Sequence, residues 1–520
     1  MNLRDTTIGI EFGSTRIKAV MIDRRHNAIA SGSYGWENTL SNGIWTYSMQ
    51  EVLFGLQSCF KDLKMDFERR FGQRLTATGA IGISAMMHGY IALDDHDRLL
   101  VPFRTWRNTT TGEAAAELTE LFDFNIPQRW SVAHLYQAVL NNEEHVPMVS
   151  KVATLASYVH YLLTGCFVSG VGDASGMFPI DSTTITYDRK MEGKFNTLLS
   201  KKGLKLKLDS VLPKVLKAGD DAGFLTSEGS LIIDPTGEFE SGIRMAPPEG
   251  DAGTGMVATN SVAVYTGNVS AGTSDFAMVV LDHIPGRHRE LDLVTTPSGE
   301  AVAMVHCNNC TTDIDNWIGL FGDFAKEFGM DIPKDELFSK LYGIALEGEP
   351  DCGGLLSCNY HSGEGVTDFD RGLPMFLHPT ESRMSVANFM RCHLYSALST
   401  LKIGMDVLKE ENIRINRILA HGGFFKTGMA GQRMLSAALG VPVSSMETAG
   451  EGGPYGMALL CAFMIWNKGE SLASYLEDKV YMGMEVSTIK ADTSEFSGFD
   501  AFIANYKRLL EVERKAVEVF

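Results

Sequence analysis

Short runs of β-branched and other apolar residues, interrupted by glycine, serine and threonine, open the chain. Residues 7–23 read TIGIEFGSTRIKAVMID, a pattern that predicts two β-strands joined by a polar turn. The pattern returns at residues 261–282, where AGTSD again separates two apolar runs. Because the repeat distance is about half of the chain, we expect each half to begin with a related hairpin.

Between and after these predicted hairpins, strand-like runs alternate with amphipathic helical segments. Residues 76–85 predict a buried strand, and residues 112–124 predict an amphipathic helix. Helical periodicity dominates residues 385–411, and residues 413–423 predict a buried strand that ends in glycines. The apolar run at residues 455–466 is shorter than the roughly 20 residues that span a bilayer, so we expect a buried helix. The alternation favours a mixed α/β fold.

The length of the chain predicts two lobes. A single hydrophobic core stops growing at roughly 250–300 residues, and the chain has 520 residues. We place the boundary beside the glycine-rich segment GDAGTG, with an N-terminal lobe over residues 1–257 and a C-terminal lobe over residues 258–520. If the two hairpins face each other across a cleft, the lobes share one nucleotide.

Composition and charge exclude several classes of function. The formal net charge of −18 opposes nucleic-acid binding, which draws affinity from Lys and Arg. Eight scattered cysteines and the absence of an apolar signal segment at the N-terminus fit a reducing cytosol. The Cys307-Asn-Asn-Cys310 pair lacks the further ligands of a structural zinc site, so we interpret it as two reduced thiols.

Phosphate-binding turns are the chemistry that the two hairpins predict. In the first turn, Gly13 permits a tight bend, and the amides and hydroxyls of Ser14 and Thr15 can donate to phosphate oxygens. Lys18 or Arg16 can add a cation. Alone, this turn is more typical of a plain hairpin. The second turn, at Gly272, Thr273 and Ser274, favours the phosphate interpretation.

With these turns, the chain resembles the FGGY carbohydrate kinase family of the actin-like ATPase superfamily. The first loop of that family reads D-x-G-(S/T)-(S/T), and residues 11–15 match it with Glu11 in place of Asp. The resemblance implies two actin-like, ribonuclease H-like lobes with a nucleotide and sugar cleft between them. It also implies ATP and Mg²⁺ as cofactors, with Glu11 and Asp251 serving the metal.

The resemblance assigns substrate-binding roles in the predicted first lobe. The segment SAMMHG resembles the S-x-Q-M-H-G segment of xylulokinases, with Met86 in place of Gln, so Met87 and His88 would line a sugar pocket. Trp106 matches the tryptophan of an L-W-x-D-x-R element, either as a sugar-stacking ring or as a core anchor. Asp173, in DASG, would lie near the substrate, although an Asx-type turn explains it equally well.

The resemblance also assigns the catalytic base and further nucleotide contacts. Asp251, in PEGDAGTG, matches the aspartate that accepts the sugar hydroxyl proton and would also contact the substrate. In the second lobe, Asn316 occupies a nucleotide-contacting position. Gly422 and Gly423 would let the base and ribose approach the backbone.

A pentulose kinase acting on a ketose such as D-xylulose or L-ribulose is therefore the leading hypothesis. A hexulose or polyol kinase of the same family is the alternative, and a non-enzymatic actin-like ATPase that gates a partner is another. A dinucleotide-dependent oxidoreductase ranks behind these because no G-x-G-x-x-G opens a helix after the first strand. We expect a small sugar as the partner, neither nucleic acid nor membrane, and a homodimer as the candidate assembly.

Overall fold

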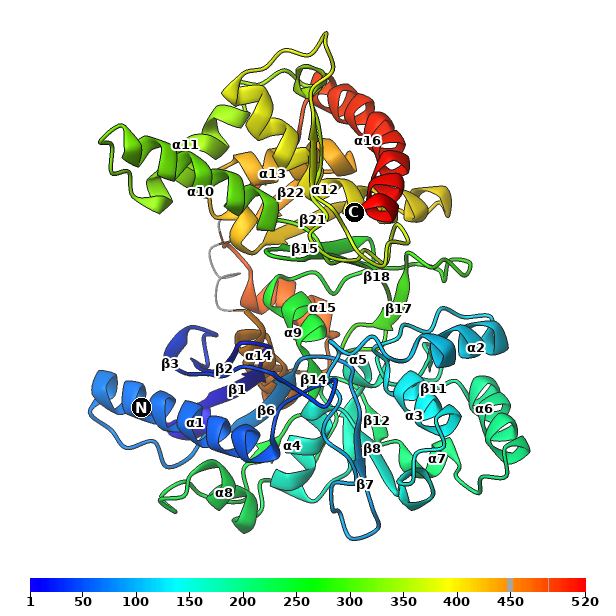
Figure 1. Ribbon diagram of the computed structural model, residues 1–520. Helices are drawn as coiled ribbons and strands as arrows, with labels where there is room; N and C mark the ends of the chain where they lie inside the picture. The colour runs from blue at the N-terminus through cyan, green and yellow to red at the C-terminus, as the bar shows by residue number, and fades with distance from the viewer. Residues whose placement is uncertain (447–451, 485) are drawn as a thin grey trace. The chain divides into compact units, whose positions relative to one another are not determined.

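The computed structural model in Figure 1 describes residues 1–446, 452–484 and 486–520 and divides into two compact units. The first unit comprises Met1–Val262, Leu293–Val302 and Glu451–Gly483, and the second comprises Ala263–Asp292, Ala303–Gly450 and Met484–Phe520. The chain thus first changes unit close to the predicted boundary at residue 257. The two units are not single continuous segments, because a late segment returns to the first unit.

The first unit is built on a mixed sheet with the strand order β13-β6-β1-β2-β3, in which β14 also pairs with β6. These strands are β1 (Thr6–Phe12), β2 (Arg16–Asp23), β3 (Ala28–Gly35), β6 (Ala80–Ala85), β13 (Arg244–Met245) and β14 (Glu249–Gly250). The predicted hairpin forms between antiparallel β1 and β2, with Glu11 opposite Lys18. The parallel neighbour β6 places Ser84 beside both Glu11 and Glu249. Three polar positions therefore lie in one row across adjacent strands.

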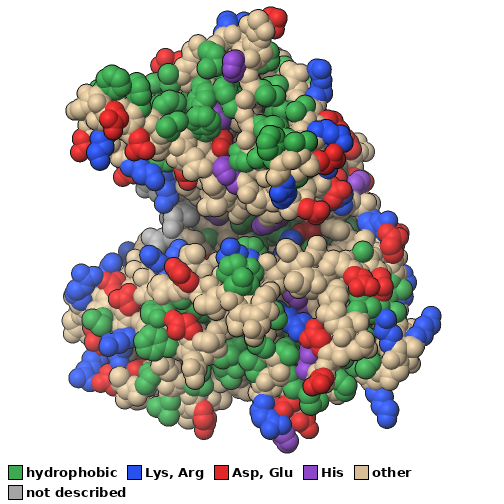
Figure 2. All heavy atoms as spheres, in the orientation of Figure 1, with side chains coloured by type: hydrophobic (Ala, Val, Ile, Leu, Met, Phe, Trp, Pro, Cys, Tyr) green, Lys and Arg blue, Asp and Glu red, His purple; other side chains and the backbone are tan. Residues whose placement is uncertain are grey.

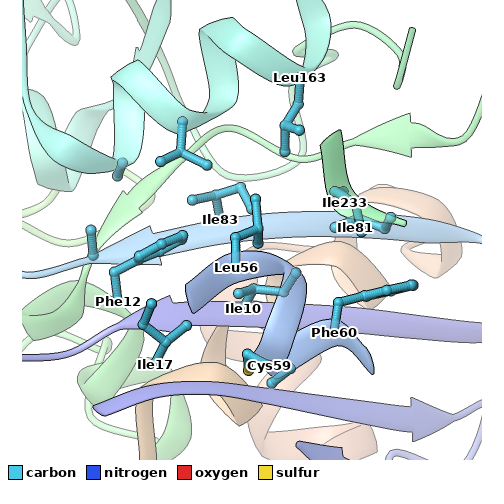
Figure 3. Packing of buried hydrophobic residues seen from close by; sticks show 14 of the residues in the cluster. Ile10, Phe12, Ile17, Leu56, Cys59, Phe60, Ile81, Ile83, Leu163 and Ile233 are labelled. Atoms are coloured by element: carbon cyan, nitrogen blue, oxygen red, sulfur yellow. The ribbon is translucent and has the colours of Figure 1, made fainter. Parts of the chain in front are cut away.

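A hydrophobic core holds this sheet against helix α1 (Met49–Phe71). In Figure 3, Leu56 and Phe60 of α1 pack with Ile10 and Ile83 of the sheet, all of them at most 1% exposed. The remaining helices of the unit follow in chain order. They are α2 (Gly112–Phe122), α3 (Ser131–Leu140), α4 (Leu155–Thr164), α5 (Val171–Ala174), α6 (Arg189–Lys201), α7 (Leu208–Val211), α8 (Ser227–Ile233), α9 (Asp251–Ala258), α14 (Gly452–Trp466) and α15 (Leu472–Tyr475).

Helix α14 explains why the late segment belongs to the first unit. Its side chains are apolar on all sides, as in a helix surrounded by protein, and it packs against β1, β6 and α9. The Thr7 hydroxyl donates to the Ala458 carbonyl at 2.9 Å, and the Tyr455 hydroxyl donates to the His26 carbonyl at 3.1 Å. The prediction of a buried helix at residues 455–466 is confirmed, and its site of burial is the first sheet.

The second unit holds most of a sheet with the order β17-β18-β16-β15-β21-β22-β23, in which the edge strand β17 spans Asp292–Thr295. Its strands are β15 (Thr266–Ala271), β16 (Asp275–Val280), β18 (Ala301–Cys307), β21 (Arg417–His421), β22 (Val443–Ser445) and β23 (Ser487–Ile489). Its helices are α10 (Thr312–Glu327), α11 (Lys334–Ala345), α12 (Val386–Glu410), α13 (Ala430–Leu439) and α16 (Thr493–Val519). Antiparallel β15 and β16 form the second predicted hairpin. The predicted helix at residues 385–411 corresponds to α12, which Ser385 caps by accepting from the Asn388 amide.

Short paired strands lie outside the two main sheets. They are β4 (Thr39–Ser41), β5 (Ile44–Thr46), β7 (Ile91–Leu93), β8 (Lys151–Ala153), β9 (Val168–Gly170), β10 (Ile180–Asp181), β11 (Thr186–Tyr187), β12 (Lys214–Leu216), β19 (Leu356–Cys358) and β20 (Met375–Leu377). Figure 2 shows acidic and basic side chains interspersed over the face in view. Among the described residues, no helix has the length and apolarity needed to cross a membrane.

Candidate active site

The turn between β1 and β2 presents unused backbone donors. The Gly13 amide donates to the Arg16 carbonyl at 3.1 Å and closes the turn. Within the described part of the chain, neither the Ser14 amide nor the Thr15 amide donates a hydrogen bond. Both residues are at least partly exposed, as is Lys18 on β2. Free amides at a glycine turn are suited to phosphate oxygens.

Two carboxylates lie close to this turn. Glu11 lies on β1, in the row of polar positions that includes Ser84 and Glu249. Burial and the nearby charge of Asp251 raise the pKa of Glu11 to about 7, and the charge of Lys18 opposes this shift. Burial also raises the pKa of Asp251 to about 6. Each carboxylate therefore holds its proton more tightly than in water because it is desolvated, and for Glu11 also because a second negative charge is near.

Asp251 is the first residue of α9, where the partial positive charge of the helix N-terminus favours a carboxylate. Its Oδ1 accepts the Met87 amide at 3.2 Å and the Ala252 amide at 2.9 Å. No residue elsewhere in the described part of the chain donates to Oδ2. One oxygen thus fixes the side chain while the other is free to accept a proton.

The carboxylate of Glu11 faces the start of α14. A Cβ added to Gly453 would lie 2.1 Å from Glu11 Oε1 and 3.0 Å from Thr254 Oγ1, so only glycine leaves room for this carboxylate. Thr254, on the first turn of α9, pairs its hydroxyl with that of Ser84 at 3.1 Å. Side chains from β1, β6 and α9 therefore meet beside one glycine.

The predicted sugar-pocket residues Met87 and His88 follow β6. Each is 5% exposed. His88 adopts a left-handed φ of 71°, and its Nδ1 lies 3.3 Å from the Gly176 carbonyl. The Met87 amide donates to Asp251, so the structure brings the predicted pocket segment to the predicted base. A direct contact of either side chain with sugar stays a prediction.

Trp106 is half-buried, and the segment that carries it is hydrogen-bonded to strand β5. Asn108 occupies the position of the Asp in the family pattern, and its side-chain amide both accepts and donates a hydrogen bond. Its Oδ1 accepts the Trp45 amide at 2.8 Å, and its Nδ2 donates to the Trp45 carbonyl at 2.8 Å. A carboxylate could not make the second bond. The departure from the family pattern therefore has a structural reason, and the Trp106 indole itself donates to Ser14 Oγ at 3.3 Å.

Asp173 lies in a fully buried polar cluster. Its Oδ2 accepts the hydroxyls of Thr154, of Ser169 at 3.0 Å and of Ser157 at 3.4 Å. Asp173 is 0% exposed, and its hydrogen bonds are to buried hydroxyl groups. Its contact with a sugar stays a prediction.

Glu249 is a residue of this cluster that sequence reasoning missed. Its carboxylate accepts the Gly172 amide at 3.3 Å and the Asp173 amide at 3.0 Å. Burial and the charge of Asp173 raise the pKa of Glu249 to about 8, and burial raises that of Asp173 to about 7. Because Glu249 precedes Gly250 and Asp251, this contact anchors the strand that leads to the predicted base. The only sequence signal was a charged residue in an otherwise apolar and glycine-rich segment.

The second predicted phosphate turn resembles the first in its hydrogen bonding. The Gly272 amide closes the turn on the Ser274 carbonyl at 2.9 Å. The carbonyls of Gly272 and Thr273 accept the amides of Thr311 and Cys310, each at 3.0 Å. Within the described residues, the amides of Thr273 and Ser274 donate no hydrogen bond, and both residues are exposed. Cys307 and Cys310 are buried and form no disulfide in this structure.

The glycines after β21 have different reasons to be glycine. Gly422 has a φ of +101°, and a Cβ there would lie 2.3 Å from the Ala271 carbonyl oxygen, so backbone packing requires glycine. A Cβ on Gly423 meets nothing within 4 Å, which leaves space for a ligand. Asn316 is exposed on α10. The nucleotide contacts predicted for these three residues stay predictions.

The donor set beside the first turn fits a hard cation. Among the residues that the structure describes, no three His, Cys, Asp or Glu side chains converge to hold a metal by themselves. Mg²⁺ is usually bound by one or two carboxylates together with phosphates and water. Glu11 accepts no hydrogen bond from the described residues, and its pKa is raised partly by Asp251. A carboxylate pair with unused oxygens therefore matches Mg²⁺.

The fold is of the mixed α/β class, its candidate site has a glycine turn with free amides beside a carboxylate pair, and sequence comparison gives the family. The chain matches the N-terminal domain of the FGGY family of carbohydrate kinases over residues 6–233 and the C-terminal domain over residues 267–465. The chain belongs to this family.

Individual relatives agree with this placement. A xylulose kinase from Haemophilus influenzae is 23% identical over 483 residues, which cover 86% of this chain and 91% of that protein. Two solved structures from Lactobacillus acidophilus each cover 98% of this chain, with 98% of their own chains matched. One is a ligand-bound xylulose kinase with a TM-score of 0.79 and 16% identity, and the other is a gluconate kinase with a TM-score of 0.78 and 17% identity.

These findings confirm the predicted fold class and the prediction of a carbohydrate kinase. The oxidoreductase and the non-enzymatic ATPase are thereby set aside. The nucleotide and sugar cleft between the lobes, the homodimer and the cytosolic location stay predictions.

Proposed function

We propose that this chain transfers the γ-phosphoryl group of ATP to a hydroxyl of a pentulose such as D-xylulose or L-ribulose. The observation that carries the proposal is Asp251, whose Oδ1 is fixed by two backbone amides while Oδ2 accepts nothing from the described residues. A fixed carboxylate whose pKa is about 6 is ionised at neutral pH and basic enough to accept a hydroxyl proton as the new P–O bond forms.

The residues of the first turn would handle the phosphates. The free amides of Ser14 and Thr15 donate to the phosphate oxygens, and the exposed Lys18 adds positive charge. Glu11 and Asp251 would hold Mg²⁺, which supplies charge neutralisation on the transferring phosphoryl group when it is bound. In the second unit, Gly272, Thr273, Asn316, Gly422 and Gly423 remain our candidates for nucleotide contacts.

The pentulose assignment rests on the relatives and on the Met87-His88 segment. The Haemophilus influenzae relative is named a xylulose kinase. The gluconate kinase structure is similar to nearly the same degree, so the fold does not choose between sugars. Hexuloses and polyols are therefore the competing substrates.

Coupled ADP release from wild-type enzyme, measured over a panel of pentuloses, hexuloses, polyols and sugar acids, tests the proposal. We expect the largest kcat/KM with D-xylulose or L-ribulose. A clear preference for a hexulose, a polyol or gluconate would contradict the pentulose assignment while leaving the kinase class intact.

A further inference from the structure

Three aromatic side chains donate hydrogen bonds to the first glycine turn, and we call Trp36, Tyr47 and Trp106 the aromatic clamp. The Trp36 indole donates to the Gly13 carbonyl at 2.7 Å, and the Tyr47 hydroxyl donates to the Ser14 carbonyl at 2.5 Å. The Trp106 indole donates to the Ser14 hydroxyl oxygen at 3.3 Å. All three come from segments far from the turn in sequence.

Two members of the clamp are rigid supports. Trp36 is 4% exposed and Tyr47 is 2% exposed. Their rings stack with a centroid distance of 4.1 Å, and Phe12 and Phe103 flank the stack at 5.9 Å and 6.4 Å. Buried, stacked rings of this kind have little rotamer freedom. The carbonyls that they hold are therefore fixed.

Fixing these carbonyls also fixes the free amides. In a trans peptide unit, the C=O of one residue and the N–H of the next point in opposite directions. The Gly13 carbonyl accepts from Trp36, so the Ser14 amide points away from that ring. The Ser14 carbonyl accepts from Tyr47, so the Thr15 amide likewise points away from the clamp. The clamp thus pre-orients the two donors that the proposed function assigns to phosphate.

Trp106 differs from the other two members. It is only half-buried, and it touches a side-chain hydroxyl instead of a carbonyl. When Ser14 Oγ accepts the indole N–H, its own O–H remains available to donate elsewhere, and accepting one bond strengthens the bond that it donates. The orientation of the Ser14 hydroxyl therefore depends on where the Trp106 ring lies.

We propose that Trp106 couples sugar binding to the phosphate turn: a ketose against the ring fixes the indole, and the indole directs the Ser14 hydroxyl toward the phosphates. This inference rests on the proposed function and on the sugar contact that the family resemblance gives to Trp106. Its consequence is that bound sugar holds the Ser14 hydroxyl in its orientation toward the phosphates, which favours transfer to the sugar over hydrolysis of ATP by water.

A double-mutant cycle on Trp106→Phe and Ser14→Ala tests the coupling. Phenylalanine keeps a ring for the sugar but removes the N–H donor. We expect kcat for D-xylulose phosphorylation to fall about three- to tenfold in Trp106→Phe, the scale of one lost neutral hydrogen bond. The sugar KM stays nearly unchanged. In the Ser14→Ala background, Trp106→Phe costs nothing further.

Binding provides a second readout that does not depend on turnover. Wild-type enzyme binds a non-hydrolysable ATP analogue more tightly when D-xylulose is present, and Trp106→Phe loses this enhancement. Trp45→Phe is the matched control, since Arg107 lies over the Trp45 ring and, among the described residues, the Trp45 indole donates no hydrogen bond to the turn. Additive losses in the cycle, a loss confined to the sugar KM, or an unchanged enhancement in Trp106→Phe would each overturn the coupling. If wild-type enzyme does not phosphorylate a ketose, the proposed function is wrong, and the coupling is wrong with it.

Discussion

Replacing Asp251 by Asn isolates the chemistry of one oxygen atom. The amide oxygen of Asn keeps the acceptor for the Met87 and Ala252 amides, and the NH₂ group replaces only Oδ2. The fold and the start of α9 are therefore expected to persist. Removal of a general base lowers kcat by about 10²–10⁴-fold. Burial is the larger cause of the raised pKa of Glu11 and the charge of Asp251 the second, so the variant also lowers that pKa and leaves Glu11 more ionised at neutral pH.

Coupled ADP release at saturating sugar and ATP gives kcat, and thermal unfolding checks the fold. Asp95→Asn is the control, since that side chain is 80% exposed and lies outside the site. Near-normal turnover of Asp251→Asn would refute the base assignment. A large loss of thermal stability would instead refute the inference that the two amide bonds survive.

Four further outcomes follow from the site. Activity falls as pH is lowered through about 6, where Asp251 gains a proton, and a flat kcat/KM profile there would contradict its role. Chelation of divalent cations abolishes phosphorylation and Mg²⁺ restores it; full activity in excess chelator would exclude the carboxylate pair as a metal site. The raised pKa values of Glu249 (about 8) and Asp173 (about 7) mean that the folded state keeps protons that the unfolded chain releases near the ordinary carboxyl pKa of about 4, so stability falls as pH rises from about 4 to about 8. Glu249→Gln reduces that fall, as measured by denaturant unfolding, and an unchanged fall would show that Glu249 does not titrate there. Gly422→Ala destabilises the fold because its Cβ would meet the Ala271 carbonyl, whereas Gly423→Ala keeps stability and raises the KM for ATP; equal stability losses would contradict this distinction.

The local elements of the fold could be predicted because their signals are local. Glycine turns between β-branched runs indicate the two hairpins. Residues 385–411 have helical periodicity, and Ser385 caps the start of the helix. The late return of the chain to the first unit could not be predicted. Helix α14 is apolar on all sides, so its sequence indicates burial but not the sheet that buries it.

The sequence could nominate candidate site residues where the residue type and its motif carry the signal. Glu11, Asp251 and Met87 carry such motifs, and the structure brings them together. The aromatic clamp and Glu249 act through contacts across many residues of sequence. In the sequence, Trp36 and Tyr47 resemble ordinary core aromatic residues, and only the structure shows their hydrogen bonds to the turn. No spacing along the chain encodes such a contact.

Phosphorus NMR of wild-type enzyme with ATP, Mg²⁺ and D-xylulose tests the central claim most directly. The account predicts that ATP is consumed as a phosphomonoester of the ketose appears in equal amount. ADP and inorganic phosphate as the only new products, with the sugar unchanged, would contradict it.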